Sequence, residues 1–184
     1  SNLDILFKYD KIKLVPFGEF LPFENILSSL GLKKITEGYG SFSKGEDASI
    51  FSLNKLKLLP LICYEIIFPE LSQNQKQKNL IVNISEDAWF GETIGPNQHI
   101  AKAIFRSIES NVFLIRSANK GFSAFIDNKG NIKKMLKPNE AGVIELNVPF
   151  VNNTQKKYKI DLIFLTLLFT CIFIFIIFNK NENK

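Results

Sequence analysis

Two cysteines and a single histidine are the side chains of this sequence best suited to nucleophilic or acid–base chemistry. Cys63 follows a short apolar run, and its thiolate would be a good nucleophile if a base or a cation lay nearby. A Cys63–His99 pair is one option. The more ordinary interpretations are that Cys63 is a small buried residue and that His99 makes a hydrogen bond near a helix start. For His99 we favour the hydrogen-bonding role over the pair with Cys63.

Charged residues near the N-terminus and beside Cys63 could support such a nucleophile. Lys11 and Glu19 flank a segment that we expect to form an apolar strand and a Pro-Phe-Gly turn. A buried lysine can stabilise negative charge that develops in a transition state. Tyr64 and Glu65 directly follow Cys63. Taken alone, Lys11 and Glu19 would be read as ordinary surface charges.

Short apolar runs separated by a helical pattern predict the elements that position these groups. A helix is expected over Pro96–Ser110, because Pro96 suits a first turn and Ile100, Ile104 and Ile108 share one face. A turn at 128–130 should lead into a strand near Ile132. The remaining expected strands are Leu56–Cys63, Leu80–Ile84, Val112–Ser117 and Phe122–Asp127. Strands that alternate with helices predict an α/β domain.

The composition changes once along the chain, near residue 150. We expect one globular domain over 1–150, a basic linker over 151–159, a transmembrane helix over 160–178 and a tail over 179–184. The helix is expected because residues 162–178 carry no charge. The chain opens without Met, so we expect it to be the C-terminal part of a longer protein.

Charge and cysteine content exclude two other classes. The excess of 23 Lys+Arg over 18 Asp+Glu gives a net charge of +5, and it is spread along the chain. A nucleic-acid-binding protein usually gathers its basic charge in a patch or stripe. Cys171 lies in the expected membrane segment and Cys63 outside it, so a disulfide framework is not expected.

Four segments, in this order, resemble the carbon–nitrogen hydrolase, or nitrilase, superfamily: YDKIKLVPFGEFLPF, LICYEIIFPE, NISEDAWFGETIGPNQH and RSIESNVFLIRSANKGFSAFIDNKG. Within it, the variants PFGEFLP, CYEIIFP and DAWFG look like the apolipoprotein N-acyltransferase family. The resemblance covers nearly the whole chain. It implies a four-layer α-β-β-α sandwich, incomplete at its N-terminus and followed by one C-terminal transmembrane helix.

The resemblance also implies the residues of an active site. Lys11 and Cys63 match two members of the family's Glu–Lys–Cys triad, with Cys63 as nucleophile. Lys11, with a backbone N–H near Tyr64, would hold the oxyanion; Glu19 and Glu65 would orient Lys11 or tune the site, and Tyr64 would shape an acyl pocket. The triad's Glu, the general base, should precede Tyr9, and nothing in residues 1–8 matches it. This chain alone is therefore expected to be inactive.

The implied reaction is a ping-pong acyl transfer at a membrane. A phospholipid would acylate Cys63, and the thioester would pass its acyl chain to the diacylglyceryl-cysteine amine of an apolipoprotein. No metal or cofactor is implied. The family works at the bacterial inner membrane with this domain on the periplasmic side, although Lys156, Lys157 and Lys159 favour a cytoplasmic flank.

The sequence departs from the family pattern at four positions, and two alternatives stay open. Glu86 stands where the family usually has Asn, Ala118 and Lys120 where it has Thr, and Lys13 where a His is common. These departures bear on substrate fit. One alternative is an amidase of the same superfamily that acts on small amides. The other is a non-catalytic remnant of a split gene, which the unmatched Glu would favour.

Overall fold

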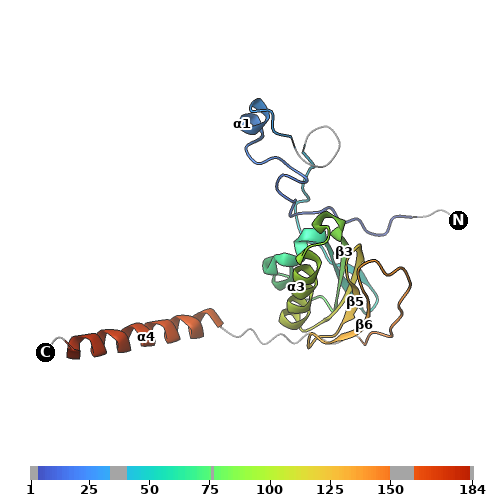
Figure 1. Ribbon diagram of the computed structural model, residues 1–184. Coiled ribbons are helices and arrows are strands. Elements are labelled where there is room, and N and C mark those ends of the chain that lie inside the picture. Colours follow the sequence, from blue (N-terminus) through green and yellow to red (C-terminus); the bar gives the residue numbers. More distant parts are fainter. Residues whose placement is uncertain (1–3, 34–40, 76, 150–159, 183–184) are drawn as a thin grey trace. The chain divides into compact units, whose positions relative to one another are not determined.

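The computed structural model describes residues 4–33, 41–75, 77–149 and 160–182 (Figure 1). The chain divides into two compact units, residues 1–153 and 154–184. The elements of the first unit, in chain order, are α1 (Glu24–Ser29), β1 (Phe51–Leu53), β2 (Leu56–Ile62), the 3-10 turn η1 (Cys63–Ile67), α2 (Pro69–Gln73), β3 (Leu80–Glu86), the 3-10 turn η2 (Asp87–Phe90), α3 (Gly95–Ser110), β4 (Phe113–Asn119), β5 (Ser123–Ile126) and β6 (Ile132–Leu136).

The first unit is built on one six-stranded mixed sheet whose strands follow sequence order. The central strands β2, β3 and β4 are parallel, and the outer strands β1, β5 and β6 pair antiparallel. Parallel neighbours need crossover connections, which here carry α2 and α3. The carboxyl ends of β2, β3 and β4 therefore meet at one edge of the sheet.

The hydrophobic core lies between one face of the sheet and its helices, and Figure 1 shows α3 along the sheet. Leu59 pairs with Ile81, and Ile81 with Leu114, so fully buried side chains line up across three strands. Ile100 and Ala103 of α3 belong to the same core. Side chains alternate between the two faces along a strand, so Ile84, three positions after Ile81 on β3, lies on the opposite face and is 60% exposed.

The α/β class predicted from the sequence is confirmed, and most elements lie where they were expected. Within the first unit, the described residues form two layers, the sheet and the helices α2 and α3 on one face of it. The four-layer arrangement stays a prediction. Short elements that lacked a clear pattern, namely α1, β1 and α2, were missed.

Of the apolar strand and the Pro-Phe-Gly turn expected between Lys11 and Glu19, the turn forms and the strand does not. This stretch forms a tight turn instead, in which the N–H groups of Glu19 and Phe20 both bond the carbonyl of Val15. Pro16 supplies no N–H for a ladder, and Phe17 adopts a left-handed φ of 61°. The turn returns the chain on itself and brings Glu19 back toward Lys11.

Of the second unit, the structure describes α4, Ile160–Glu182. It is helical over the predicted 160–178 and continues into the expected tail. Among the described residues, no helix has both the length and the apolar character required to span a bilayer. The transmembrane helix is thus not confirmed. The linker expected over 151–159 lies outside the described residues.

Candidate active site

Cys63 lies at the sharp bend where β2 passes into η1. Its φ is 51°, in the left-handed region that non-glycine residues rarely adopt. That conformation costs roughly 1–2 kcal/mol relative to a right-handed one. Strained backbone persists only where the surroundings hold it in place, and such positions cluster at functional sites. The thiol is free and partly exposed, at the carboxyl edge of the parallel strands.

The carboxylate of Glu65 joins this bend to the N-terminal segment. Its Oε1 accepts hydrogen bonds from the N–H groups of Ile12 (2.6 Å) and Lys13 (3.2 Å). Its Oε2 accepts from the N–H of Ile62 (2.7 Å) and the hydroxyl of Tyr9 (3.0 Å). Glu65 is fully buried. One carboxylate therefore holds the residue after Lys11 and the residue before Cys63.

Tyr9 is fixed as a donor in this arrangement. Burial, together with the negative charge of Glu65, raises the pKa of the Tyr9 phenol above its usual range. The phenol therefore stays protonated and keeps donating to Glu65. This contact extends the anchored segment by three residues on the N-terminal side of Ile12.

Lys11 and Glu19 form a bidentate ion pair, with Nζ 2.6 Å and 2.8 Å from the two carboxylate oxygens. The Lys11 side chain is only 11% exposed, so the pair is largely shielded from water. Glu19 also accepts the N–H of Val15 at 2.9 Å. The tight turn thus orients the ammonium of Lys11 next to the segment that Glu65 anchors.

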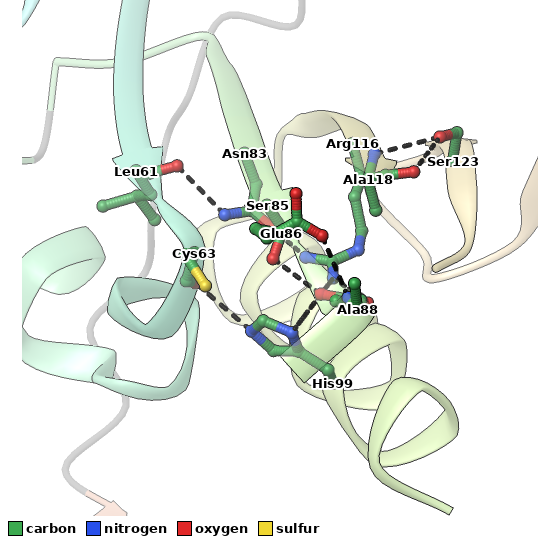
Figure 2. Close-up of polar contacts among 11 residues, drawn as sticks. Leu61, Cys63, Asn83, Ser85, Glu86, Ala88, His99, Arg116, Ala118 and Ser123 are labelled. Atoms are coloured by element: carbon green, nitrogen blue, oxygen red, sulfur yellow. Dashed lines mark hydrogen bonds and ion pairs between the residues drawn. The ribbon is translucent and has the colours of Figure 1, made fainter. Parts of the chain in front are cut away.

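His99 contacts the backbone of Cys63. Its Nε2 lies 3.2 Å from the carbonyl oxygen of Cys63, as Figure 2 shows. A carbonyl oxygen only accepts, so Nε2 must carry the proton and cannot accept one from the thiol. The geometry speaks against the Cys–His pair and for the hydrogen-bonding role that we favoured.

A buried polar network surrounds His99. The guanidinium of Arg116 bonds both oxygens of Asp87, at 2.7 Å and 2.9 Å, and also contacts Asn83. His99 Nδ1 lies 2.9 Å from Asp87, and Ser85 donates to the same carboxylate at 2.7 Å. Sequence reasoning considered His99 but missed its partners Asn83, Ser85, Asp87 and Arg116. The signal was present, since Asn83 and Arg116 are polar residues within the apolar runs LIVNI and VFLIRS.

The other residues of interest lie around this edge in separate contacts. Tyr64 makes an edge-to-face contact with Phe68. Glu86 accepts the N–H of Ala88 at 3.0 Å and the amide of Asn119 at 2.8 Å. Lys13 pairs with the carboxylate of Glu70 at 3.3 Å.

An open pocket of about 500 Å³ lies along the end of β4 and the start of β5. Its lining does not include Lys11 or Cys63. The lining residues are Ser117, Ala118, Asn119, Lys120, Gly121, Ser123, Leu136, Asn139, Glu140, Ala141 and Gly142. Two of the four positions that depart from the family pattern, Ala118 and Lys120, therefore border open space.

Comparison with known proteins places most of this chain beside one group of curated relatives. The apolipoprotein N-acyltransferase of Allorhizobium ampelinum is 47% identical over 145 residues, 78% of this chain and 28% of that protein. That of Rhizobium rhizogenes is 46% identical over 138 residues, 74% of this chain and 26% of that protein. The chain thus spans about a quarter of the length of these curated relatives.

A solved structure shows the fold, and a family model shows the family. A mutant amidase of the nitrilase superfamily from Nesterenkonia AN1 superposes with a TM-score of 0.51, at 19% identity, over 71% of this chain and 45% of that one. At this identity the likeness shows the fold alone. A family model described as carbon-nitrogen hydrolase matches residues 2–158. The chain belongs to the carbon–nitrogen hydrolase family.

Proposed function

We propose that this chain carries the nucleophile and the oxyanion-stabilising lysine of an apolipoprotein N-acyltransferase. The observation that carries the proposal is the shared carboxylate of Glu65, which bonds the N–H groups next to Lys11 and next to Cys63. The names of the relatives at 46–47% identity support the choice of acyl transfer.

In the first half-reaction, the Cys63 thiolate attacks an ester carbonyl of a phospholipid. The carbonyl electrons move to oxygen, and Lys11 and a backbone N–H near Tyr64 stabilise that oxyanion. Collapse breaks the ester C–O bond. The lysophospholipid oxygen leaves and takes the proton that the base removed from the thiol, and a thioester remains on Cys63.

In the second half-reaction, the amine of a diacylglyceryl-cysteine attacks the thioester carbonyl. The C–S bond breaks, the amide forms, and the base takes the proton of the amine. Water must be kept from the thioester during the exchange, since hydrolysis would release a free fatty acid. Tyr64 and Glu19 serve the same roles in both halves, shaping the acyl site and orienting Lys11.

The general base is not assigned to the described carboxylates of the site. Both oxygens of Glu65 accept N–H or O–H donors, and Glu65 is fully buried. The carboxylate of Glu19 accepts hydrogen bonds from the ammonium of Lys11 and from the N–H of Val15. We therefore propose that a Glu outside this chain is the base, and that residues 1–184 alone are inactive.

Membrane attachment is part of the proposal. The uncharged stretch 162–178 lies in α4, and the substrates named for the relatives are lipoproteins. We propose that α4 attaches the protein to the inner membrane with the sheet domain on the periplasmic side. Alkaline carbonate extraction of membranes tests the attachment. Release of the protein into the soluble fraction would contradict it.

The direct test measures transfer of a labelled acyl chain from phospholipid to a diacylglyceryl peptide by the full-length protein. Cys63→Ala should abolish both transfer and the hydroxylamine-sensitive label on the enzyme. Cys171→Ala is the matched control and should retain both. Ammonia release from small amides, without acyl transfer, would instead support an amidase. Full turnover by residues 1–184 alone would contradict the assignment of the base outside the chain.

A further inference from the structure

A buried, charged network lies between the sheet and α3 and reaches the backbone of the nucleophile turn. Asn83 on β3, Asp87 on η2, His99 on α3 and Arg116 on β4 are each less than 5% exposed. In Figure 2 the side chains of Asn83, His99 and Arg116 converge from β3, α3 and β4. Buried charges are costly unless they are paired and hydrogen-bonded, so a network of this kind calls for a role.

The network makes hydrogen bonds to two backbone carbonyls at the nucleophile turn, that of Leu61 and that of Cys63 itself. His99 Nε2 donates to the carbonyl of Cys63 at 3.2 Å, and Asn83 Nδ2 donates to the carbonyl of Leu61 at 3.0 Å. Cys63 has the left-handed φ of 51°. A strained turn needs external contacts to persist, and these two hydrogen bonds come from the core side of the sheet.

Asp87 stays ionised in this network. Burial alone would raise the pKa of Asp87, but its contact with His99, the charge of Arg116 and the hydrogen bond from Ser85 outweigh burial and hold the value at about 2. Burial lowers the pKa of Arg116, while the negative charges of Asp87 and of an ionised Cys63 oppose that shift.

We propose that His99 is a positioning residue for Cys63, held in place by Asp87 and Arg116. His99 fixes the peptide of the nucleophile turn through the Cys63 carbonyl, so that the thiolate stays aligned with Lys11 and the turn's N–H groups. Asp87 and Arg116 hold the imidazole with Nε2 toward that carbonyl. The inference rests on the proposed function only in taking Cys63 as the nucleophile.

A pair of conservative variants separates positioning from general support of the fold. The amide nitrogen of Gln reaches the place of Nε2, whereas that of Asn reaches only the place of Nδ1. His99→Gln thus keeps a donor for the Cys63 carbonyl, and His99→Asn loses it. Both variants lose ring contacts, including the edge-to-face contact with Phe90. Ser107→Ala, which removes a buried hydrogen bond to Ile104 on the same helix, is the control.

The experiment measures iodoacetamide alkylation of Cys63 in the full-length protein by mass spectrometry, with the wild-type protein measured in parallel as the reference. His99→Asn should slow alkylation and lower kcat about tenfold or more with an unchanged KM for phospholipid, because misplacement of a reacting atom costs rate. His99→Gln should stay within about threefold, since it keeps the hydrogen bond. Ser107→Ala should lower the melting temperature without slowing alkylation.

The outcomes distinguish this inference from the proposed function. Equal alkylation rates in His99→Asn and His99→Gln, whether both slow or both normal, overturn the positioning role. Slowing of Cys63 in Ser107→Ala also overturns it, because the effect would then follow stability. The wild-type protein could transfer no acyl chain while the three variants still show the expected differences in alkylation rate. In that case the proposed function fails and the positioning role stands.

Discussion

The carboxylate of Glu65 accepts the backbone N–H of Ile12 at 2.6 Å across 53 positions of sequence. The same carboxylate accepts the N–H of Ile62, next to Cys63. A single buried side chain therefore fixes two chain segments that each carry a proposed catalytic residue. This relationship makes Glu65 the residue whose loss should separate Lys11 from Cys63.

Glu65→Gln should destabilise the protein by about 2–4 kcal/mol, because the amide NH₂ cannot accept the donors that one carboxylate oxygen now accepts. Urea unfolding measures the change. Limited proteolysis should show earlier cleavage between residues 9 and 13. Glu70→Gln is the control: Glu70 pairs with Lys13 with its side chain 47% exposed, so its loss should cost less than about 1 kcal/mol. Equal costs for the two variants would contradict the bridging role.

Lys11→Met should lower kcat for acyl transfer by about 10²–10³-fold, the effect of removing one oxyanion donor. Glu19→Gln should have a smaller effect, about tenfold, since Lys11 keeps its charge but loses its bidentate partner. Asp10→Asn is the matched control, because Asp10 pairs with Lys8 in an exposed position. Steady-state assays of the full-length protein give these values. Unchanged kcat in Lys11→Met would exclude the oxyanion role.

Asp87 should contribute to acid stability. Its pKa in the folded protein is about 2, below the ordinary value of about 3.9. The folded state therefore binds fewer protons, so the contribution is complete above about pH 4 and is lost as pH falls toward 2, by about 2 kcal/mol. Urea unfolding at a series of pH values should show this loss in the wild type. The difference between wild type and Asp87→Asn should shrink over that range, and a constant difference would contradict the assignment.

Gly121→Ala should disturb the network beside Cys63. A Cβ at this position would lie 2.6 Å from both Cβ and Cγ of Asp87, inside van der Waals contact. Asp87 is held by several partners and cannot move freely, so overpacking of about 1–3 kcal/mol is expected. Gly142→Ala is the control, because its nearest neighbour, Leu136 Cδ2, is at 3.5 Å. Thermal unfolding compares the two, and similar melting temperatures would be the contrary result.

Local pattern accounts for what the sequence predicted well. The strand expected over Leu56–Cys63 is β2, Leu56–Ile62, and the helix expected over Pro96–Ser110 is α3, Gly95–Ser110. Apolar runs and 3.6-residue spacing reflect which face an element buries, so they can be read along the chain. Motif order also identifies the candidate site residues Cys63, Lys11, Glu19, Tyr64 and Glu65.

Tertiary structure alone decided how those residues are joined. Nothing in the local pattern indicates that Glu65 bonds Ile12, that Asp87 pairs with Arg116, or that His99 turns toward the carbonyl of Cys63 rather than its thiol. The sequence does not indicate the left-handed φ of Cys63 either, because a non-glycine residue gives no signal for that conformation. Periodicity records whether a side chain is buried, whereas the partner of a buried polar group depends on which strands become neighbours and in what register.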